Sequence, residues 1–315
     1  MMEAHATAET RPILLLTGAG GQMGVAIRRC PEAGMFTVWA CNRARLDITD
    51  PAAVQAVVAA AAQAAAATGR ALVVLNAAAW TAVEAAETDP AAAAAAEAVN
   101  HHAAAHLAAA CAAHDAPLIH LSTDYVFAGS AREPWPETAP LAPLSVYGAS
   151  KAAGETAIRA RLERHVIVRT AWIYGQDGQN FLRTLLRLAP ERTQFQVVND
   201  QWGSPTAAAD LARALLAIAA RLATDPAAPV GTVHAAGSGV ATWYDFACAI
   251  FALRAAAGHP APDVVPISSA DYPSKVRRPA YSVLDTRRLC ADWGLALPPW
   301  PQALARVLAS PAFRE

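Results

Sequence analysis

The sequence has few of the features that mark membrane-spanning, secreted or nucleic-acid-binding proteins. Only 16% of its 315 residues are charged, the formal net charge is −1, and no basic block is present. This balance argues against binding to nucleic acid or to anionic membranes through bulk electrostatics. No stretch approaches the roughly 18 strongly apolar residues that suggest a membrane span. Residues 1–11 lack the basic start and apolar core of a secretory signal, so we expect a frayed leader there and a cytoplasmic protein.

Cysteine is scarce as well. The five cysteines are scattered and form no CxxC pair: Cys30, Cys41, Cys111, Cys248 and Cys290. An odd, unclustered set favours buried thiols in a reducing compartment over disulfides or a zinc site. Alanine, in contrast, accounts for much of the 55% hydrophobic content, and we interpret its runs as helix-forming positions. The chain is long enough for one large or two smaller domains.

The first chemical signal is a glycine-rich turn near the start of the chain. A short apolar run, residues 12–17, is followed by Gly18, Gly21 and Gly24 and then by a helical pattern. Between a strand and a helix, such glycines allow a tight turn and close approach of a pyrophosphate, which the helix amides then face. The pattern predicts dinucleotide binding. After the next strand, Arg43 replaces the acidic residue common in NAD-specific proteins, which favours NADPH; a solvated arginine is the alternative.

Strand and helix patterns alternate through most of the chain. Further apolar strands are expected at residues 36–40, 71–75, 118–121, 165–169 and 230–235. The alternation predicts an α/β fold: a Rossmann-like doubly wound parallel sheet with a smaller C-terminal substrate-binding lobe. The expected NAD(P)-binding Rossmann domain comprises residues 12–170 and about 206–235. The lobe comprises residues 171–205 and 236–315.

Tyr147 and Lys151 stand four residues apart at the start of an amphipathic helical stretch. On a helix such positions share one face, about 5–6 Å apart at Cβ. A lysine charge there would lower the tyrosine pKa from about 10 and give an acid able to protonate a carbonyl oxygen. A chance surface pair is the alternative. Ser122 and Thr123, which directly follow a strand, are placed to hydrogen-bond a substrate oxygen or the phenol.

Two features between these motifs stay open at this stage. A helical pattern covers residues 90–115 and contains Asn100, which is either a helix-breaking active-site amide or an unremarkable surface residue. A proline-rich loop, residues 128–145, precedes the Tyr147 helix. Loops of this length in compact domains often act as lids or binding loops.

The glycine turn with a downstream Tyr-x-x-x-Lys resembles the extended short-chain dehydrogenase/reductase superfamily. In that superfamily the tyrosine is the general acid/base, the lysine binds the nicotinamide ribose, and a serine or threonine hydrogen-bonds the reacting carbonyl. The resemblance assigns these roles to Tyr147, Lys151 and Thr123.

Longer motifs make the resemblance more specific. They occur in the same order as in one family and together span about residues 12–308. They are similar to those of the dTDP-4-dehydrorhamnose reductases. The motifs lie at residues 21–24, 46–50, 76–84, 122–127, 146–148, 169–175, 198–206 and 277–285. This family reduces the 4-keto group of dTDP-4-dehydro-6-deoxy-L-mannose with NADPH or NADH, giving dTDP-L-rhamnose.

The resemblance also implies binding residues. Those for the cofactor are Gly18, Gly21, Gln22, Met23, Gly24, Asp47, Ile48, Ala78, Ala79, Trp80, Tyr147 and Lys151. Those for the dTDP-linked keto sugar are Thr81, Val83, Thr123, Asp124, Tyr125, Trp172 and Arg278. Interdomain packing is the alternative for Tyr125 and Trp172, and a simple salt bridge is the alternative for Arg278.

The sequence departs from the family at a few positions. Trp80 stands where histidine or tyrosine is usual, and Trp202 and Tyr281 replace residues that vary. These changes put the details of substrate binding in doubt more than the reaction class. Some relatives bind a metal between subunits through glutamates; no such ligands are assigned here, so a divalent ion such as Mg²⁺ and a homodimer stay open.

Three other functions compete with this interpretation. The nearest is a reductase of a different nucleotide-linked 4-keto-6-deoxysugar. Another is a non-catalytic regulatory NADP-binding subunit, as in the regulatory subunit of methionine adenosyltransferase, which resembles this family; the retention of Tyr147, Lys151 and Thr123 argues against it. A third is an epimerase or dehydratase of the same superfamily, which Asp124 would suit, although the Tyr-Val-Phe that follows fits a reductase better.

Overall fold

A six-stranded parallel sheet forms the centre of the computed structural model, which describes residues 10–313. The strands are β1 (Ile13–Thr17), β2 (Thr37–Cys41), β3 (Leu72–Asn76), β4 (Leu118–Thr123), β5 (His165–Thr170) and β10 (Gly231–His234). Their order, β10-β5-β4-β3-β1-β2, confirms the predicted doubly wound α/β sheet, including the return of the chain to the sheet near residue 231. The leader expected at residues 1–11 lies mostly outside the described residues.

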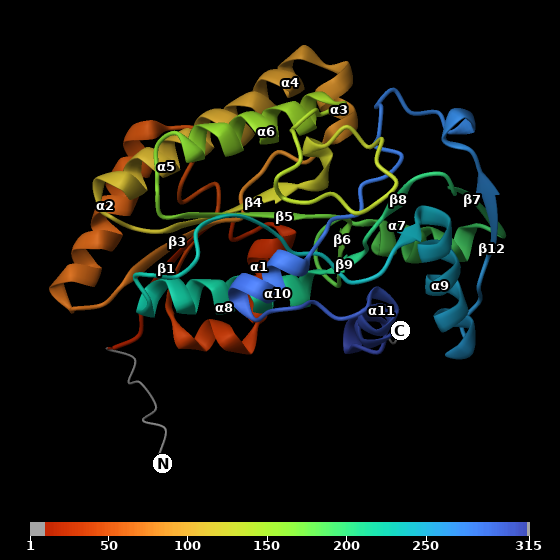
Figure 1. Cartoon of the computed structure of the whole chain (residues 1–315). Helices are drawn as coiled ribbons and strands as arrows, with labels where there is room; N and C mark the ends of the chain where they lie inside the picture. The colour runs from red at the N-terminus through yellow and green to blue at the C-terminus, as the bar shows by residue number, and fades with distance from the viewer. Residues whose placement is uncertain (1–9, 314–315) are drawn as a thin grey trace.

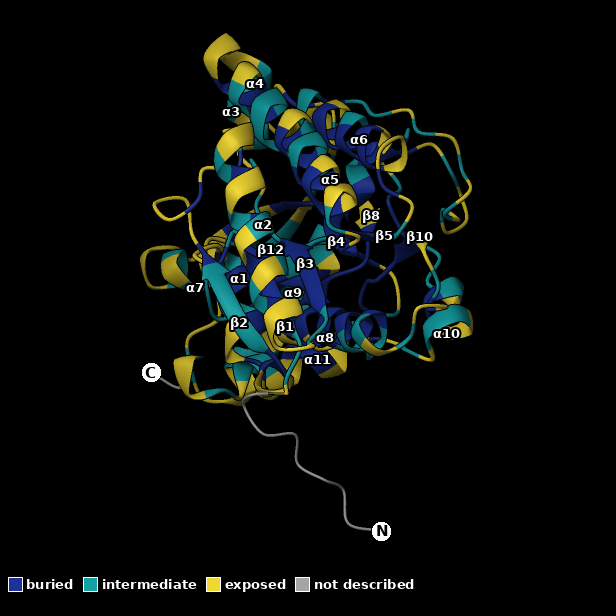
Figure 2. Cartoon of the chain, turned by 90° about the vertical axis from the view of Figure 1, so that its left-hand side faces the viewer, coloured by how far each residue is buried: buried dark blue, intermediate teal, exposed yellow. Residues whose placement is uncertain are grey.

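Helices cover both faces of the sheet (Figure 1). On one face lie α1 (Gln22–Arg29) and α8 (Ala208–Thr224); on the other lie α2 (Pro51–Ala67), α5 (Ala103–Ala113) and α6 (Val146–Arg159). Leu14 and Leu16 belong to the apolar cluster on the first face, whereas Ile13 and Leu15 belong to the cluster on the second. Because both faces are covered, a strand such as β1 is buried at every position and is apolar up to Thr17. Figure 2 shows the buried strands between helices whose outer faces are exposed.

The helical pattern predicted over residues 90–115 is confirmed, with an irregular turn around Asn100. The chain forms α3 (Val83–Thr88), α4 (Pro90–Glu97), a π-helical turn, η2 (Ala98–His102), and then α5. The amide of Ala103 donates to the carbonyl of Ala98, which is the i→i+5 bond of a π-helical turn. Asn100 is buried in this turn, so it is not a surface residue.

Gly154 of α6 packs directly on the π-helical turn. A Cβ at this position would lie 2.1 Å from the carbonyl oxygen of Asn100. Gly154→Ala should therefore force the two helices apart and lower stability by about 1–3 kcal/mol, as overpacking does. Thermal or urea unfolding would measure the change. Gly34→Ala is the matched control, because nothing lies within 4 Å of its Cβ position; equal stability of both variants would contradict the packing argument.

The remaining elements gather beside the carboxyl ends of the strands, on the right of Figure 1. They include α7 (Phe181–Leu188), α9 (Trp243–Ala256) and α11 (Trp300–Leu308), with β7 (Gln194–Val198) paired to β12 (Asp263–Ile267). Two-residue strands pair β6 (Ile173–Tyr174) with β9 (Thr206–Ala207) and β8 (Trp202–Gly203) with β11 (Ala241–Thr242). These elements share an apolar cluster of their own. In contrast, α10 (Arg287–Trp293) contributes Leu289 to the core on the α1 and α8 face of the sheet.

All five cysteines are free, as predicted, but not all are buried. Cys30, Cys41 and Cys111 lie in the core, Cys248 is half-buried and Cys290 is exposed in the middle of α10. Among residues 10–313, no helix combines the length and apolar character that crossing a membrane requires.

Candidate functional site

The glycine turn after β1 lies against the segment that follows β3. Gly18 has φ +68°, and a Cβ there would lie 2.4 Å from the backbone nitrogen of Ala78. A Cβ on Gly24 would lie 2.2 Å from the carbonyl oxygen of Gly18. Glycine is therefore required at both positions, first for the left-handed backbone and then for the close packing of α1 on the turn.

A cavity of about 470 Å³ opens between this turn and the end of β3. It lies where the sheet order changes direction, the position at which open α/β sheets bind ligands. The predicted cofactor residues that line it are Gly18, Gly21, Asp47, Ile48, Ala78, Ala79 and Trp80. Arg43 also lines it, beside residues that the sequence analysis did not select: Gly20, Asn42, Ala44, Leu46, Ala77 and Val99. A scan of the residues just after β2 and β3 would have found most of them.

Five predicted cofactor residues do not line this cavity: Tyr147 and Lys151 of α6, which are described below, and three residues near the glycine turn, Gln22, Met23 and Gly24. Met23 is part of the apolar core, and Gly24 packs against the turn. The side-chain amide of Gln22 donates to the carbonyl of Ile173, 3.4 Å away. Met23 and Gly24 therefore support the packing of α1 on the glycine turn, whereas Gln22 contacts the segment that follows β5.

Asn100 holds Trp80 in the cavity wall. Its Oδ1 accepts from the backbone N–H of Trp80 (2.9 Å), and its Nδ2 donates to the carbonyl of the same residue (3.1 Å) and to Ser150 Oγ (3.0 Å). The indole Nε1 of Trp80 is buried and has no hydrogen-bond partner among the described residues. A buried donor without a partner is costly, so a ligand that accepts from it would gain from that contact.

Helix α6 presents Tyr147 to the carboxyl edge of the sheet. Ser145 caps the helix by accepting from the amide of Gly148, and Glu87 accepts from the amide of Val146. The half-buried Tyr147 ring lies 5.8 Å from the ring of Tyr125, in an edge arrangement. Burial raises the pKa of the Tyr147 phenol, and a hydrogen bond with Thr123 acts in the opposite direction.

Lys151 does not lower the Tyr147 pKa in this structure, so that prediction needs correction. The ammonium is 1% exposed and contacts β4 instead: Nζ donates to the carbonyl of Leu121 and lies 3.2 Å from Nε2 of His120. The four-residue spacing places the two side chains on one helix face, but the long lysine chain turns towards the sheet.

The two neighbouring hydroxyls at the end of β4 point to different partners. Ser122 Oγ donates to Glu155 Oε1 (2.6 Å), inside a buried ion-pair cluster. Thr123 Oγ1 donates to Asp124 Oδ1 (2.9 Å) and lies close to the Tyr147 phenol. Because alternate residues of a strand face opposite sides, only Thr123 belongs to the site.

Asp124 adds a buried carboxyl beside these groups. It is 2% exposed, and burial raises its pKa to about 6. Its Oδ2 has no hydrogen-bond partner among the described residues. The hydroxyl of Ser282 lies close enough to oppose the rise in pKa, so a polar ligand would compete with it for the Asp124 carboxylate.

A second cavity, of about 480 Å³, lies among α7, β7 and the start of α9. Tyr125 and Arg278 line it, together with Arg192 and Trp243. Arg278 also forms a salt bridge with Glu84 of α3 (2.8 Å), next to the predicted substrate residues Thr81 and Val83. The cavity offers guanidinium groups and aromatic rings, which suit a phosphorylated ligand with a planar base.

Trp172 lies beside this second cavity in a strained backbone conformation. Its φ is +47°, and its ring stacks on that of Trp243 with centroids 3.6 Å apart. Gly203 makes room for the ring, because a Cβ there would lie 2.3 Å from it. Strain of this kind in a non-glycine residue often marks a functional position.

Within residues 10–313, one group of three side chains could hold a metal ion: Glu97, His101 and His102 of the π-helical region.

Comparison with known proteins agrees with this geometry. The model of the RmlD substrate binding domain family matches residues 12–312. The dTDP-4-dehydrorhamnose reductase of Aggregatibacter actinomycetemcomitans is 36% identical over 299 residues, which is 94% of this chain and 98% of the relative. The enzyme of the same name from Mycobacterium tuberculosis is 40% identical over 308 residues, 95% of this chain and 93% of the relative.

A solved structure shows the same arrangement. The dTDP-4-dehydrorhamnose reductase of Bacillus anthracis, in complex with NADP, superposes with a TM-score of 0.85 at 32% identity, covering 95% of this chain and 99% of that one. By the family model and these relatives, the chain belongs to the dTDP-4-dehydrorhamnose reductase family.

Proposed function

We propose that the protein reduces the 4-keto group of dTDP-4-dehydro-6-deoxy-L-mannose to give dTDP-L-rhamnose, with NADPH as the preferred cofactor and Tyr147 as the proton donor. The observation that carries the proposal is the convergence of Tyr147, Thr123 and Lys151 at the carboxyl edge of the sheet, beside the cavity at its switch point. The family membership and the relative that binds NADP support it.

The first cavity fits a dinucleotide. Gly18 and Gly21 leave the backbone open to a pyrophosphate, and the unpartnered indole N–H of Trp80 offers a donor inside the cavity wall. Arg43 in the same wall suits the 2′-phosphate of NADPH. NADPH supplies the hydride for reduction of the keto group.

The protein's own contribution is a proton and a polar pocket for the oxygen that becomes negative. Tyr147 donates its phenolic proton to that oxygen, and burial keeps the phenol protonated until the transfer. Thr123 orients the phenol, and its hydroxyl proton turns from Asp124 Oδ1 to donate to the same oxygen. Asp124 accepts from a sugar hydroxyl through its buried Oδ2.

The second cavity holds the nucleotide part of the substrate. Arg278 and Arg192 pair with the diphosphate, and Tyr125 and Trp243 provide apolar surface for the base and sugar. We assign residues 171–205 and most of 236–315 to a lobe that closes over the sheet edge, with α10 belonging to the sheet side.

The test is NADPH oxidation by the purified protein with enzymatically made dTDP-4-keto-6-deoxy-L-mannose. NADH and the GDP- and UDP-linked keto sugars are assayed alongside. Turnover of the dTDP sugar above the others, with NADPH favoured, supports the proposal. Preference for a GDP or UDP sugar would identify a different reductase, and NADPH binding without turnover of any keto sugar would point to a regulatory subunit.

Lys151→Ala should impair both cofactor binding and turnover. Loss of a hydrogen bond from a charged or strongly polar group costs about 1.5–3 kcal/mol, or roughly ten- to a hundredfold in each. A fluorescence titration with NADPH and steady-state kinetics would measure the two effects. Lys275→Ala is the control, because Lys275 is the second lysine of the chain and is exposed. Unchanged affinity and rate in Lys151→Ala would contradict the role of Lys151.

A further inference from the structure

A row of buried polar side chains connects the end of β1 to Lys151. Thr17 Oγ1 donates to Asn76 Oδ1 (2.6 Å), Asn76 Nδ2 lies 3.0 Å from His120 Nδ1, and His120 Nε2 lies 3.2 Å from Lys151 Nζ. Each of these residues is at most 1% exposed. They come from β1, β3, β4 and α6, so the row crosses beneath the proposed active site from the glycine turn to the lysine.

The hydrogen bonds fix the orientation of Asn76. Its Oδ1 also accepts from the backbone N–H of Ala78, 3.1 Å away, so the oxygen faces Thr17 and Ala78. The NH₂ group must therefore face His120. Because an amide NH₂ can only donate, His120 Nδ1 must be an unprotonated acceptor.

The tautomer of His120 follows from this contact. Burial and the neighbouring Lys151 lower the pKa of His120 well below its usual value, so the ring is neutral and carries one proton. With Nδ1 unprotonated, that proton sits on Nε2, which faces Lys151 Nζ.

Lys151 can accept from this donor only in its neutral form. An ammonium group has no lone pair, whereas a neutral amine can accept from His120 Nε2–H and still donate to the carbonyl of Leu121. Burial lowers the pKa of Lys151 to about 8, in the same direction. Glu155, the nearest carboxylate on α6, favours the charged form but is already paired with Arg169 and Arg159.

We propose that His120 is a positioning residue whose proton, locked on Nε2 by Asn76, favours the neutral amine form of Lys151 in the free protein. The proposal rests on the proposed function only in that Lys151 belongs to the catalytic group. Lys151 gains its charge by taking a proton from solvent when an acceptor other than His120 is brought to Nζ. Residues of β1, β3 and β4 thus influence the protonation state of a lysine on α6.

The chain offers a direct test because it has only two lysines, Lys151 and Lys275. In ¹³C-lysine-labelled protein carrying Lys275→Arg, Lys151 is the only labelled side chain, and its NMR signal should titrate near pH 8. In the ¹⁵N spectrum, His120 should show the Nε2–H tautomer and no titration between about pH 5 and 8. A Lys151 midpoint at or above the free lysine value of about 10.4, or an Nδ1–H tautomer of His120, would overturn the proposal.

Asn76→Asp provides the matched perturbation. A carboxylate facing Nδ1 accepts its proton, which moves the histidine to the Nδ1–H tautomer and leaves Nε2 to accept from a charged lysine. The Lys151 midpoint should rise by at least one pH unit together with the change of tautomer, and a rise without that change would contradict the mechanism. These signals need no substrate, so a protein that shows them yet fails to reduce the sugar would refute the proposed function alone.

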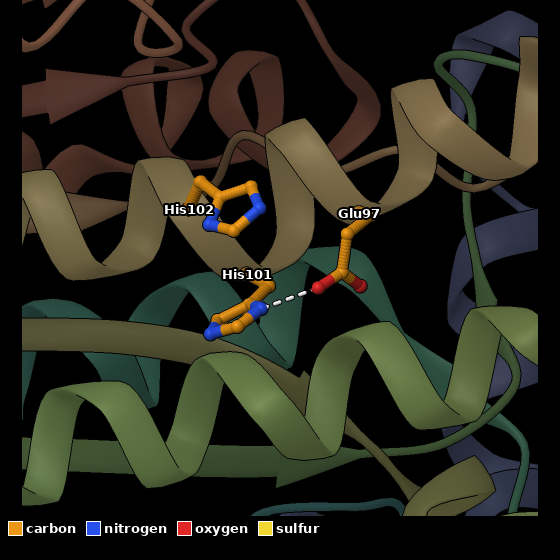
Figure 3. Close-up of side chains that lie close together, drawn as sticks. All are labelled: Glu97, His101 and His102. Atoms are coloured by element: carbon orange, nitrogen blue, oxygen red, sulfur yellow. Dashed lines mark hydrogen bonds and ion pairs between the residues drawn. The ribbon is translucent and has the colours of Figure 1, made fainter.

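A second, independent site lies on the outer side of the π-helical turn. The side chains of Glu97, His101 and His102 project from this region, with their ligand atoms within 4.8 Å of one another (Figure 3). In an α-helix of about 3.6 residues per turn, the fifth residue after Glu97 would lie roughly 140° around the axis. The wider i→i+5 turn brings His102 back towards Glu97, so the backbone assembles the group.

The three side chains match the preferences of a transition metal. His101 Nδ1 lies 2.5 Å from Glu97 Oε1, and the rings of His101 and His102 stack with centroids 4.6 Å apart. We infer that two imidazoles and one carboxylate here bind a divalent transition metal such as Zn²⁺, with the remaining coordination position open to water because His102 is exposed.

Calorimetric titration of the full chain with Zn²⁺ tests this second site. One equivalent should bind, and His101→Ala and His102→Ala should each weaken binding by about tenfold or more. His259→Ala, a histidine outside the group, should leave it unchanged. Absence of binding to the wild-type chain, or binding that both variants retain, would refute the site.

Discussion

Tyr147→Phe is expected to lower kcat for the dTDP keto sugar by about 10²–10⁴-fold, the usual contribution of a positioned general acid. The substitution removes one hydroxyl and keeps the ring, so the edge contact with Tyr125 is preserved. The hydrogen bond with Thr123 is lost with the hydroxyl. Because Tyr147 is absent from the wall of the first cavity, NADPH affinity should change little.

Tyr174→Phe is the control for this variant. Tyr174 is also buried, but its hydroxyl contacts only the carbonyl of Trp300, at 3.5 Å, within the separate apolar cluster. Steady-state kinetics and an NADPH titration on both variants would separate chemistry from binding. If Tyr147→Phe kept most of its turnover, or if both variants lost it equally, Tyr147 would not be the proton donor.

The sheet could be predicted because its signal is local. Each strand is an apolar run followed by a helix pattern, and alternation of the two permits few topologies. The strand boundaries differ slightly from the predicted ones. β2 begins at Thr37, and β4 extends to Thr123, so Ser122 and Thr123 end a strand instead of following it. The π-helical turn could not be predicted, since it lies between alanine-rich segments that fit one ordinary helix, and its packing against Gly154 appears only in the fold.

The sequence allowed the residues of the site to be predicted, but not the contacts that their side chains form. Spacing placed Tyr147 and Lys151 on one helix face, yet it did not show that Lys151 turns towards His120. It also could not separate Ser122 from Thr123, because that depends on which face of β4 meets the phenol. His120 looks like any strand residue in the sequence; its role depends on Asn76, which is 44 residues away along the chain.

The largest loss of stability is expected from Glu155→Ala. No sequence motif discussed above marks Glu155 as important. Its carboxylate is fully buried and accepts two hydrogen bonds from Arg169, at 2.8 and 2.7 Å, and one each from Arg159 and Ser122, both at 2.6 Å. Arg169 is itself 1% exposed. Glu155→Ala would leave this guanidinium buried without its carboxylate, which costs about 3–5 kcal/mol.

Urea unfolding at pH 7 would measure the loss. Arg288→Ala is the control, because Arg288 and Asp292 form a partly exposed pair on α10 whose removal should cost at most about 1 kcal/mol. If Glu155→Ala lowered the free energy of unfolding no more than the control does, the buried ion pair would contribute little to stability.

The pH dependence of the same variant gives an independent measurement. Although burial opposes it, hydrogen bonds and charge from Arg169 hold the pKa of Glu155 below its usual value near 4.5. A carboxyl whose pKa is lowered by folding stabilises the folded state fully above its unfolded pKa and loses that contribution as the pH falls through the folded value. The stability difference between wild type and Glu155→Ala should therefore be constant from about pH 8 to 5 and shrink below about pH 4.5. A difference that grew on acidification would mean that the buried carboxyl is protonated in the folded protein, and that Arg169 is held by other groups.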